Sequence, residues 1–310
     1  MSNADVAVVQ LERTSVSPAR ELIRWGFLPA MVGLMAVGSW LAGSGAAKLQ
    51  LMAVLLVAIG FSFAAERIAP YETSWNSPRG DGGRDLAHTM VNEGLQLVSL
   101  VSLPVLVNLV GFEGVWPDDW SFWMQVLVSV VVLDAGLTLG HWWSHQWSPL
   151  WRLHAVHHSV RRFYGFNGLM KHPLHQLFET GVATAPLVLI GLPADVASAL
   201  VVCVGVQLLV QHSNVDYHAD AVRWLVAVNQ LHRFHHLKWP GVGDVNFGLF
   251  FTVWDRLLGT YVWDPYRRFA SDVLGIAAEP DFPVAYVEQL VRPFKPYTPV
   301  HTDIPAGWRS

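Results

Sequence analysis

The sequence is poor in charge and in cysteine. Only 14% of its 310 residues are charged, against about 25% in an average soluble chain, and the net charge is −4. The single cysteine, Cys203, allows neither an internal disulfide nor a thiolate zinc site, so we expect it to fill space in an apolar helix. These shortages exclude a disordered chain, a secreted disulfide scaffold and a protein that binds nucleic acid through a basic surface.

Long apolar runs take the place of the missing charge, and hydrophobic residues make up 52% of the chain. A helix rises about 1.5 Å per residue, so about 20 apolar residues cross a hydrocarbon core of about 30 Å. We predict four membrane spans, at residues 26–47, 49–65, 94–112 and about 120–140. Two shorter runs, at 180–194 and 196–211, predict a helical hairpin that enters the membrane and returns, with two thin spans as the alternative.

The basic residues gather on one side of the four predicted spans. Arginine occurs before the first span, after the second and after the fourth, whereas the loop at 113–119 is acidic. The positive-inside rule therefore places the N-terminus and the segment after the fourth span in the cytoplasm. We expect a polar N-terminal tail (1–24), a membrane domain (25–262, with a histidine-rich core at 134–262) and a polar C-terminal tail (263–310).

The fold class that follows is all-α. We predict an integral membrane helical bundle of about four transmembrane helices plus a short membrane hairpin. A cytoplasmic, histidine-rich helical cap is expected to cover one end of this bundle, because the histidine-rich segments lie just outside the apolar runs.

Histidine is concentrated in one part of the chain. Of the 14 histidines, 12 lie between His141 and His236. Residues three or four apart lie on one face of a helix, so a group with such spacing is expected to point its imidazoles at one place. One H-x3-H and two H-x2-H-H groups have this spacing: His141 and His145; His154, His157 and His158; and His232, His235 and His236.

These eight histidines predict a metal centre. Neutral imidazole suits iron, zinc, copper and nickel, and eight ligands exceed the needs of one ion, so we expect two ions. The sequence has no HExxH motif and no cysteine ligand set, which favours redox iron with dioxygen over hydrolytic zinc, although spacing alone leaves the metal open. The isolated histidines His88, His218 and His301 are expected to be ordinary polar residues.

Further motifs stand among the histidine groups, in the order Asp134, His212-Ser213-Asn214, Asn246-Phe247-Gly248 and 254–261. Over about 134–262 this arrangement resembles the fatty acid hydroxylase/sterol desaturase superfamily, most closely its bacterial branch and alkylglycerol monooxygenase. The resemblance implies a membrane di-iron oxygenase that uses dioxygen and two electrons to hydroxylate or desaturate an unactivated C–H bond of a lipid. It also implies nine ligands for the two iron ions, namely His141, His145, His154, His157, His158, His212, His232, His235 and His236.

The sequence departs from this family pattern at two positions. The sphingolipid hydroxylase branch has a histidine four residues before the position of His212, where this chain has Leu208, and many bacterial relatives have glutamate in place of His175. Two roles are open to His175: it supplies the missing ligand, or it orients a ligand imidazole. Asp134 is expected to hydrogen-bond a ligand imidazole, with a helix-capping role as the alternative, and Asn246 is expected to support the site by packing and turning the chain.

Lipid hydroxylation is the leading functional prediction, and desaturation by the same site is its close alternative. A non-enzymatic metal or haem protein is the alternative of a different class, but it requires histidines in the middle of long spans. The 310 residues include no fused cytochrome or ferredoxin domain, so we expect electrons from a separate electron-transfer protein. The other expected partners are the lipid substrate and the membrane lipids.

Overall fold

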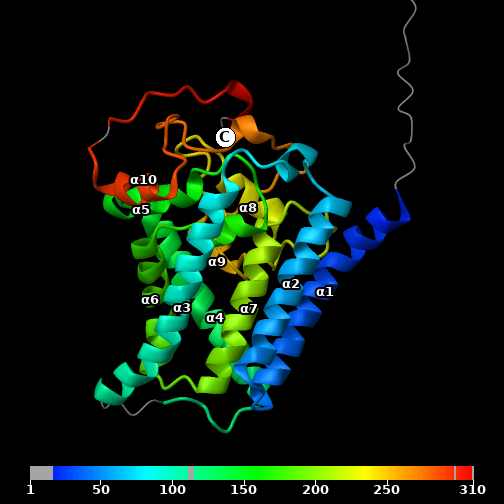
Figure 1. Cartoon of the computed structure of the whole chain (residues 1–310), viewed down its shortest axis with the longest axis vertical. Helices are drawn as coiled ribbons and strands as arrows, with labels where there is room; N and C mark the ends of the chain where they lie inside the picture. Colours follow the sequence, from blue (N-terminus) through cyan, green and yellow to red (C-terminus); the bar gives the residue numbers. More distant parts are fainter. Residues whose placement is uncertain (1–16, 111–114, 297, 309–310) are drawn as a thin grey trace, which may run out of the picture.

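The computed structural model describes residues 17–110, 115–296 and 298–308, and this part of the chain is helical, with isolated β-bridges but no β-strands (Figure 1). The predicted all-α class is therefore confirmed. The α-helices are α1 (Pro18–Gly43), α2 (Lys48–Ile68), α3 (Gly82–Val110), α4 (Phe122–Gln146), α5 (Ser148–His158), α6 (Pro173–Leu189), α7 (Ala194–His212), α8 (Asn229–His235), α9 (Val253–Leu258) and α10 (Tyr286–Val291).

Four of the described helices, α1, α2, α4 and α7, are long and apolar enough to cross a membrane. The run at 196–211 was expected to be one arm of a short hairpin, but α7 also takes in Ala194, Asp195 and His212. Its 19 residues reach about 28 Å, which favours the alternative of a full span. The predicted third span, 94–112, lies mostly in α3, which is not among these four candidates.

Helix α1 begins before its apolar run. The Ser17 side chain accepts a hydrogen bond from the Arg20 backbone N–H, and Pro18 occupies the first turn, where its missing N–H costs nothing. Residues 18–24, which were expected in the polar tail, are therefore helical. Arg20 and Arg24 both reach Asp216, at 3.2 and 3.3 Å, and this contact ties the start of α1 to the segment after α7.

Close helix pairs build the bundle core. Helix α1 lies against α2 and α7, and α4 lies against α6. At Gly136 in α4 a Cβ atom would stand 2.8 Å from the Ala183 Cα in α6, so only glycine permits this approach. Cys203 is buried in α7 with its sulfur 3.5 Å from the Ser39 hydroxyl, as expected of a residue that fills space.

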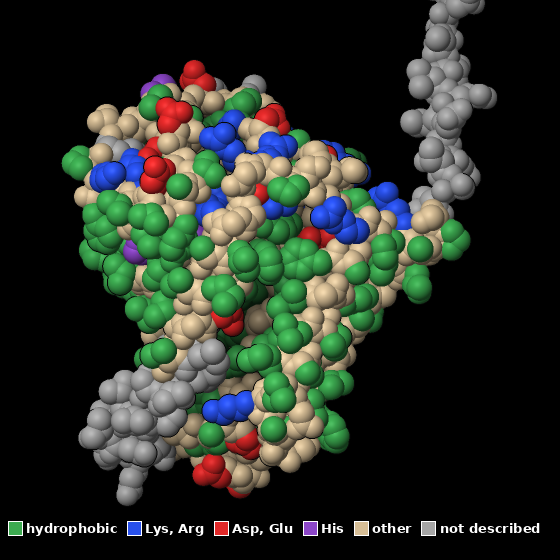
Figure 2. Space-filling model, viewed as in Figure 1, with side chains coloured by type: hydrophobic (Ala, Val, Ile, Leu, Met, Phe, Trp, Pro, Cys, Tyr) green, Lys and Arg blue, Asp and Glu red, His purple; other side chains and the backbone are tan. Residues whose placement is uncertain are grey.

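On the face that Figure 2 shows, most of the charged side chains gather at one end of the molecule, a few lie at the opposite end, and many apolar side chains lie between. We call this charged end the cap; it is formed by α5, α8, α10 and the loops around them, and the N-terminal end of α1 lies at the same end (Figure 1). Residues beyond 263, expected to be a tail, fold back over the cap, where the Gln289 Oε1 atom lies 2.9 Å from His88 Nε2. The site described next lies where the cap meets the bundle.

Candidate metal centre

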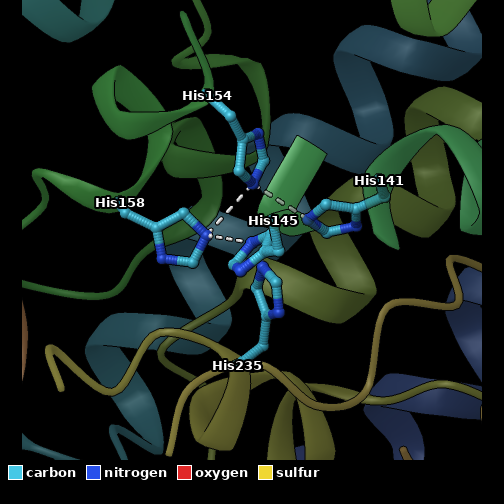
Figure 3. Close-up of side chains that lie close together, drawn as sticks. All are labelled: His141, His145, His154, His158 and His235. Atoms are coloured by element: carbon cyan, nitrogen blue, oxygen red, sulfur yellow. Dashed lines mark hydrogen bonds between the residues drawn. The ribbon is translucent and has the colours of Figure 1, made fainter. Parts of the chain in front are cut away.

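Five imidazoles from three helices converge on one point (Figure 3). One ring nitrogen of each lies within 4.8 Å of a ring nitrogen of every other. Three Nε2–Nε2 distances in this group are 3.0 Å (His141 to His154), 3.0 Å (His154 to His158) and 3.1 Å (His145 to His158). We call these residues the first histidine cluster: His141 and His145 of α4, His154 and His158 of α5, and His235 of α8.

Four more histidines form a second group beside the first. The second histidine cluster consists of His157 of α5, His212 of α7, and His232 and His236 at α8. The Nε2 atom of His232 lies 2.9 Å from that of His212 and 3.2 Å from that of His236. The structure thus brings all nine histidines named from the family resemblance into two adjacent, buried groups.

Each H-x2-H-H motif is divided between the two clusters, which corrects the expectation that each motif points at a single place. In α5, His154 and His158 join the first cluster and His157 joins the second. At α8 the assignment to the clusters is reversed: His232 and His236 join the second cluster, and His235 joins the first. Around a helix axis, side chains at positions i and i+4 point in directions about 40° apart, whereas those at i+3 and i+4 point about 100° apart. The middle histidine of each motif therefore faces a different side from the other two.

The loop at residues 244–247 holds three imidazoles of the first cluster by their Nδ1 atoms. A carbonyl or carboxylate oxygen can only accept a hydrogen bond, so each of these Nδ1 atoms carries the ring proton and each Nε2 carries a lone pair. The contacts are His141 to the Phe247 carbonyl at 3.0 Å, His145 to the Asp244 carboxylate at 2.7 Å, and His235 to the Val245 carbonyl at 2.9 Å.

The residues of the first cluster fit a metal ion. The Nε2 lone pairs of His141 and His145 lie 3.0 and 3.1 Å from the Nε2 atoms of His154 and His158, an arrangement that a shared cation can stabilise. The His235 Nε2 atom is buried and has no hydrogen-bond partner among the described residues. Two nitrogens that each lie about 2.1 Å from one ion, at a right angle, are about 3.0 Å apart, which matches the spacing between His141 and His154.

Burial keeps these imidazoles in the form that binds metal. In α5 and at α8, desolvation is the main cause that holds each imidazole pKa well below its usual range, and the neighbouring histidines add to it. At neutral pH the rings are therefore uncharged, with a nitrogen lone pair available. The residues affected are His154, His157, His158, His232, His235 and His236.

Asp134 supports the site through the backbone. It lies inside α4, so it does not cap a helix end, and it is fully buried. In place of the expected bond to an imidazole, its carboxylate accepts hydrogen bonds from the indole N–H of Trp254 at 3.0 Å and from the backbone N–H groups of Leu249, Phe250 and Phe251 at 2.8–3.0 Å. Asp134 thereby anchors the chain that follows the 244–247 loop.

Asn246 and Asp255 complete the support of this loop. Asn246 has a φ of 53°, a left-handed conformation that asparagine tolerates. Its side-chain amide donates to the Leu231 carbonyl at 3.0 Å and the Val262 carbonyl at 2.8 Å, as the packing role predicts. Asp255 accepts hydrogen bonds from the backbone N–H groups of Phe247 and Gly248 at 2.7 and 2.9 Å.

His175 lies beside the first cluster. Its ring centroid is 4.5 Å from that of His154, and its Nε2 atom is 2.9 Å from the Ser144 hydroxyl. Together with His154 and Glu179 it forms a third group of close donor atoms. Leu208 lies one turn before His212 of the second cluster, so His175 does not occupy the place of the histidine missing there.

Two residues of the site were missed in the sequence. Asp244 receives the His145 hydrogen bond, and its only signal was its place two residues before the Asn246-Phe247-Gly248 motif. Glu179 is buried beside His175, and its signals were the four-residue spacing from that histidine and its position as the one acidic residue of α6. Both carboxylates are paired, Asp244 with His145 and Glu179 with Lys171.

The other histidines have separate roles. His88 is buried and contacts the Lys171 carbonyl and the Gln289 side chain, each at 2.9 Å. His172 caps the start of α6. His218 stacks on Trp25, and the side chain of His301 is 93% exposed. None of these four belongs to a metal-capable group of the described residues.

An apolar cavity lies in the membrane band beneath the clusters. It holds about 1040 Å³ of empty space, its open mouth included, and α4, α6 and α7 supply most of its wall. Leu133, Ala183 and Leu200 are among the lining residues. At its polar end Lys171 and Glu179 form an ion pair of 2.5 Å, with Glu179 close to His175. We call this space the membrane cavity; a hollow among apolar side chains is visible in Figure 2.

A helical bundle with membrane-spanning candidates, two histidine clusters able to hold metal and an apolar cavity points to a class, that of membrane enzymes with a histidine-rich site. Residues 126–260 match the model of the fatty acid hydroxylase family. The ornithine lipid hydroxylase OlsE of Rhizobium tropici is 33% identical over 241 residues, which cover 74% of this chain and 71% of that protein. The chain belongs to the fatty acid hydroxylase family.

More distant relatives extend the comparison. An alkylglycerol monooxygenase of Danio rerio is 26% identical over 153 residues, covering 47% of this chain and 31% of that protein. A Delta(7)-sterol 5(6)-desaturase of Candida glabrata is 25% identical over 211 residues, covering 62% of this chain and 54% of that protein. No solved structure matches the chain. The relatives are oxygen-dependent hydroxylases and desaturases of lipids, and the chain is accordingly an oxidoreductase.

Proposed function

We propose that this protein is a membrane-bound di-iron oxygenase that hydroxylates an unactivated C–H bond of a lipid with dioxygen and two electrons. The observation that supports this most is the pair of histidine clusters, which the membrane cavity approaches at Glu179, 3.7 Å from His175. Iron, when bound, supplies the oxidising chemistry with dioxygen. The chain itself holds the ions, excludes water and positions one carbon of the lipid.

The ligand sets follow from the two clusters. One ion is held by the first histidine cluster and the other by the second, and the 244–247 loop orients three of the first set. His175 acts on the first ion, either as a further ligand or by orienting His154, from which its ring is 4.5 Å away. The His175→Ala variant separates these roles. If His175 only orients His154, the variant should bind the first ion about 10–100-fold more weakly with the same number of ligands. If His175 is itself a ligand, the first ion should lose one ligand.

The lipid substrate enters the membrane cavity from the bilayer. The apolar wall, with residues such as Leu133 and Leu200, suits an alkyl or acyl chain. At the inner end, the Lys171–Glu179 pair offers charge to a polar group of the lipid. OlsE is named for ornithine lipids, so we propose a polar-headed membrane lipid of that type as the first substrate to test.

The cap faces the cytoplasm in this proposal. Arg20 and Arg24 lie in the first turns of α1, and Arg67, Arg79 and Arg84 lie around the α2–α3 connection, so the cap end of the bundle carries the positive charge that orients membrane proteins. A separate cytoplasmic electron-transfer protein then supplies the two electrons.

Desaturation by the same site is the alternative, because both reactions begin with removal of a hydrogen atom. A bis-histidine haem is disfavoured, because its two axial nitrogens stand about 4 Å apart, whereas His141 and His154 have Nε2 atoms 3.0 Å apart. The geometry therefore supports bare ions over a porphyrin.

Metal analysis and lipid mass spectrometry test the proposal together. The detergent-purified protein is expected to contain close to two iron ions per chain, and membranes that contain it should yield a lipid heavier by one oxygen. A lipid lighter by two hydrogens would establish desaturation instead. Protein without bound metal after anaerobic reconstitution with Fe²⁺ would refute the metal centre, and unchanged lipids with a fully loaded protein and a chemical reductant would refute the reaction.

A further inference from the structure

The histidine centre has a second approach, from the cap. A cavity of about 910 Å³ of empty space, its open mouth included, is lined by His145, His158 and His235 of the first histidine cluster. We call it the cap cavity. It shares no lining residue with the membrane cavity, so the two spaces approach the centre separately.

The walls of the cap cavity come from α5, from the segment at 237–244 and from the C-terminal segment. Ser148 and Trp151 of α5 form one side, and Ala278 in the C-terminal segment forms another. The Trp151 ring lies over the histidines, with its centroid 5.0 Å from that of His145 and 5.3 Å from that of His158. Trp151 therefore narrows the passage to the first cluster.

Asp244 gives the cap cavity a carboxylate at its inner end. Its side chain is 36% exposed, and one of its oxygens accepts the hydrogen bond from His145 Nδ1 at 2.7 Å. Its other oxygen accepts from the Gly241 backbone N–H at 2.9 Å, and the carboxylate shares the cavity wall with three histidines of the first cluster. An exposed carboxylate in this position can attract a hydrated divalent cation before the histidines replace its water. The membrane cavity also holds a carboxylate, Glu179, but Lys171 pairs with it, and an ion would first have to leave water along a mostly apolar wall.

We propose that the cap cavity is the route by which divalent metal ions reach the first histidine cluster, with Asp244 as the first carboxylate that they meet. Lipid uses the membrane cavity and metal ions use the cap cavity. This inference rests on the metal centre proposed above, but it does not depend on which lipid reaction the centre performs.

The test measures how fast the metal-free protein binds Co²⁺, followed by its visible absorption in stopped flow. Ser148→Trp and Ala278→Trp fill the cap cavity from different walls, and each is expected to slow binding about tenfold without changing the final number of ions bound. Trp151→Ala widens the passage and should speed binding. Removal of bound Co²⁺ by a chelator should change in the same directions.

Thr184→Trp is the matched control, because it adds the same ring to the membrane cavity. It is expected to leave the rate of Co²⁺ binding unchanged and to block access of the lipid. The proposal is overturned if Thr184→Trp slows Co²⁺ binding while the two cap variants, folded by thermal melting, bind at the wild-type rate. These rates need no lipid turnover, so a failure of the proposed function is distinguished from a failure of this route.

Discussion

The two histidine clusters differ in how their rings are held. In the first cluster, the 244–247 loop reaches in from outside the helices and accepts hydrogen bonds from three Nδ1 atoms. In the second, His212 Nδ1 bonds the Leu208 carbonyl of its own helix at 3.2 Å. The Nδ1 atoms of His232 and His236 are buried and have no partner in the described part of the chain.

In the second cluster His157 Nδ1 also bonds a carbonyl, that of Met170 at 3.3 Å, and packing adds to these two hydrogen bonds. The Phe163 ring stacks on His212 with centroids 5.5 Å apart and meets the edge of His236 at 5.2 Å. A hydrogen bond at Nδ1 fixes the tautomer and the orientation of an imidazole more closely than packing against an apolar side chain does. From this difference we expect two non-equivalent metal sites, with the ion in the first cluster held more tightly.

Removal of one histidine from either cluster should have the largest effect. His235→Ala is expected to empty the first cluster and His232→Ala the second, so each variant should retain about one ion per chain by metal analysis. Activity should fall by more than the roughly 100-fold that loss of an orienting residue costs, because both ions are required. Retention of both ions in either variant would contradict the division of the α8 motif between the clusters.

Chelation of the wild-type protein should release the two ions in separate steps. The second cluster, with two unpartnered Nδ1 atoms, is expected to lose its ion first, with an affinity about 10–100-fold lower. The His235→Ala variant should then show only the weaker step and His232→Ala only the stronger one. A single step for the wild type, with equal affinities in the two variants, would remove the proposed difference.

Asp244→Asn should weaken the first cluster alone. The amide keeps the shape of the carboxylate but removes its charge, so the affinity of the first cluster for its ion is expected to fall by about tenfold. This is the low end of the range for loss of a residue that orients a metal ligand. Asp264→Asn is the matched control, since Asp264 pairs with Arg267 away from the histidines. Equal weakening of both chelation steps would show that Asp244 does not act on one cluster.

The smallest expected effect is on the stability of the metal-free protein. Burial lowers the pKa values of His158 and His236 well below their usual range, whereas in the unfolded chain each titrates near about 6.5. Below that pH the unfolded chain binds protons that the folded chain cannot, so stability is full above about pH 6.5 and falls as the pH decreases. The melting temperature should therefore be lower at pH 5.5 than at pH 7.5.

Replacing one histidine in each cluster compares the two contributions to this pH dependence. His158→Gln and His236→Gln each remove one buried group, and each should flatten the fall in melting temperature between pH 7.5 and pH 5.5. A steeper fall in both variants would contradict the assignment of neutral, buried rings.

Much of the site could be predicted from local spacing. The H-x3-H and H-x2-H-H groups named eight histidines because helical periodicity is a local property, and the family pattern added His212. The spacing did not predict that His157 leaves its neighbours for the second cluster, because that depends on which helices lie on either side of α5. Asp134 shows the same limit, since its partners at 249–254 are more than a hundred residues away.

Local sequence was enough to predict an all-α chain with membrane spans and histidine groups suited to metal, because the length of an apolar run and the spacing of histidines on a helix are local properties. Only the tertiary structure decided how the nine histidines divide between two clusters, and that Asp244 and Glu179 stand beside them. The physical reason is that a metal centre is assembled from distant segments. The packing of α4, α5, α7 and α8, with the loop that Asp134 anchors, brings those segments together.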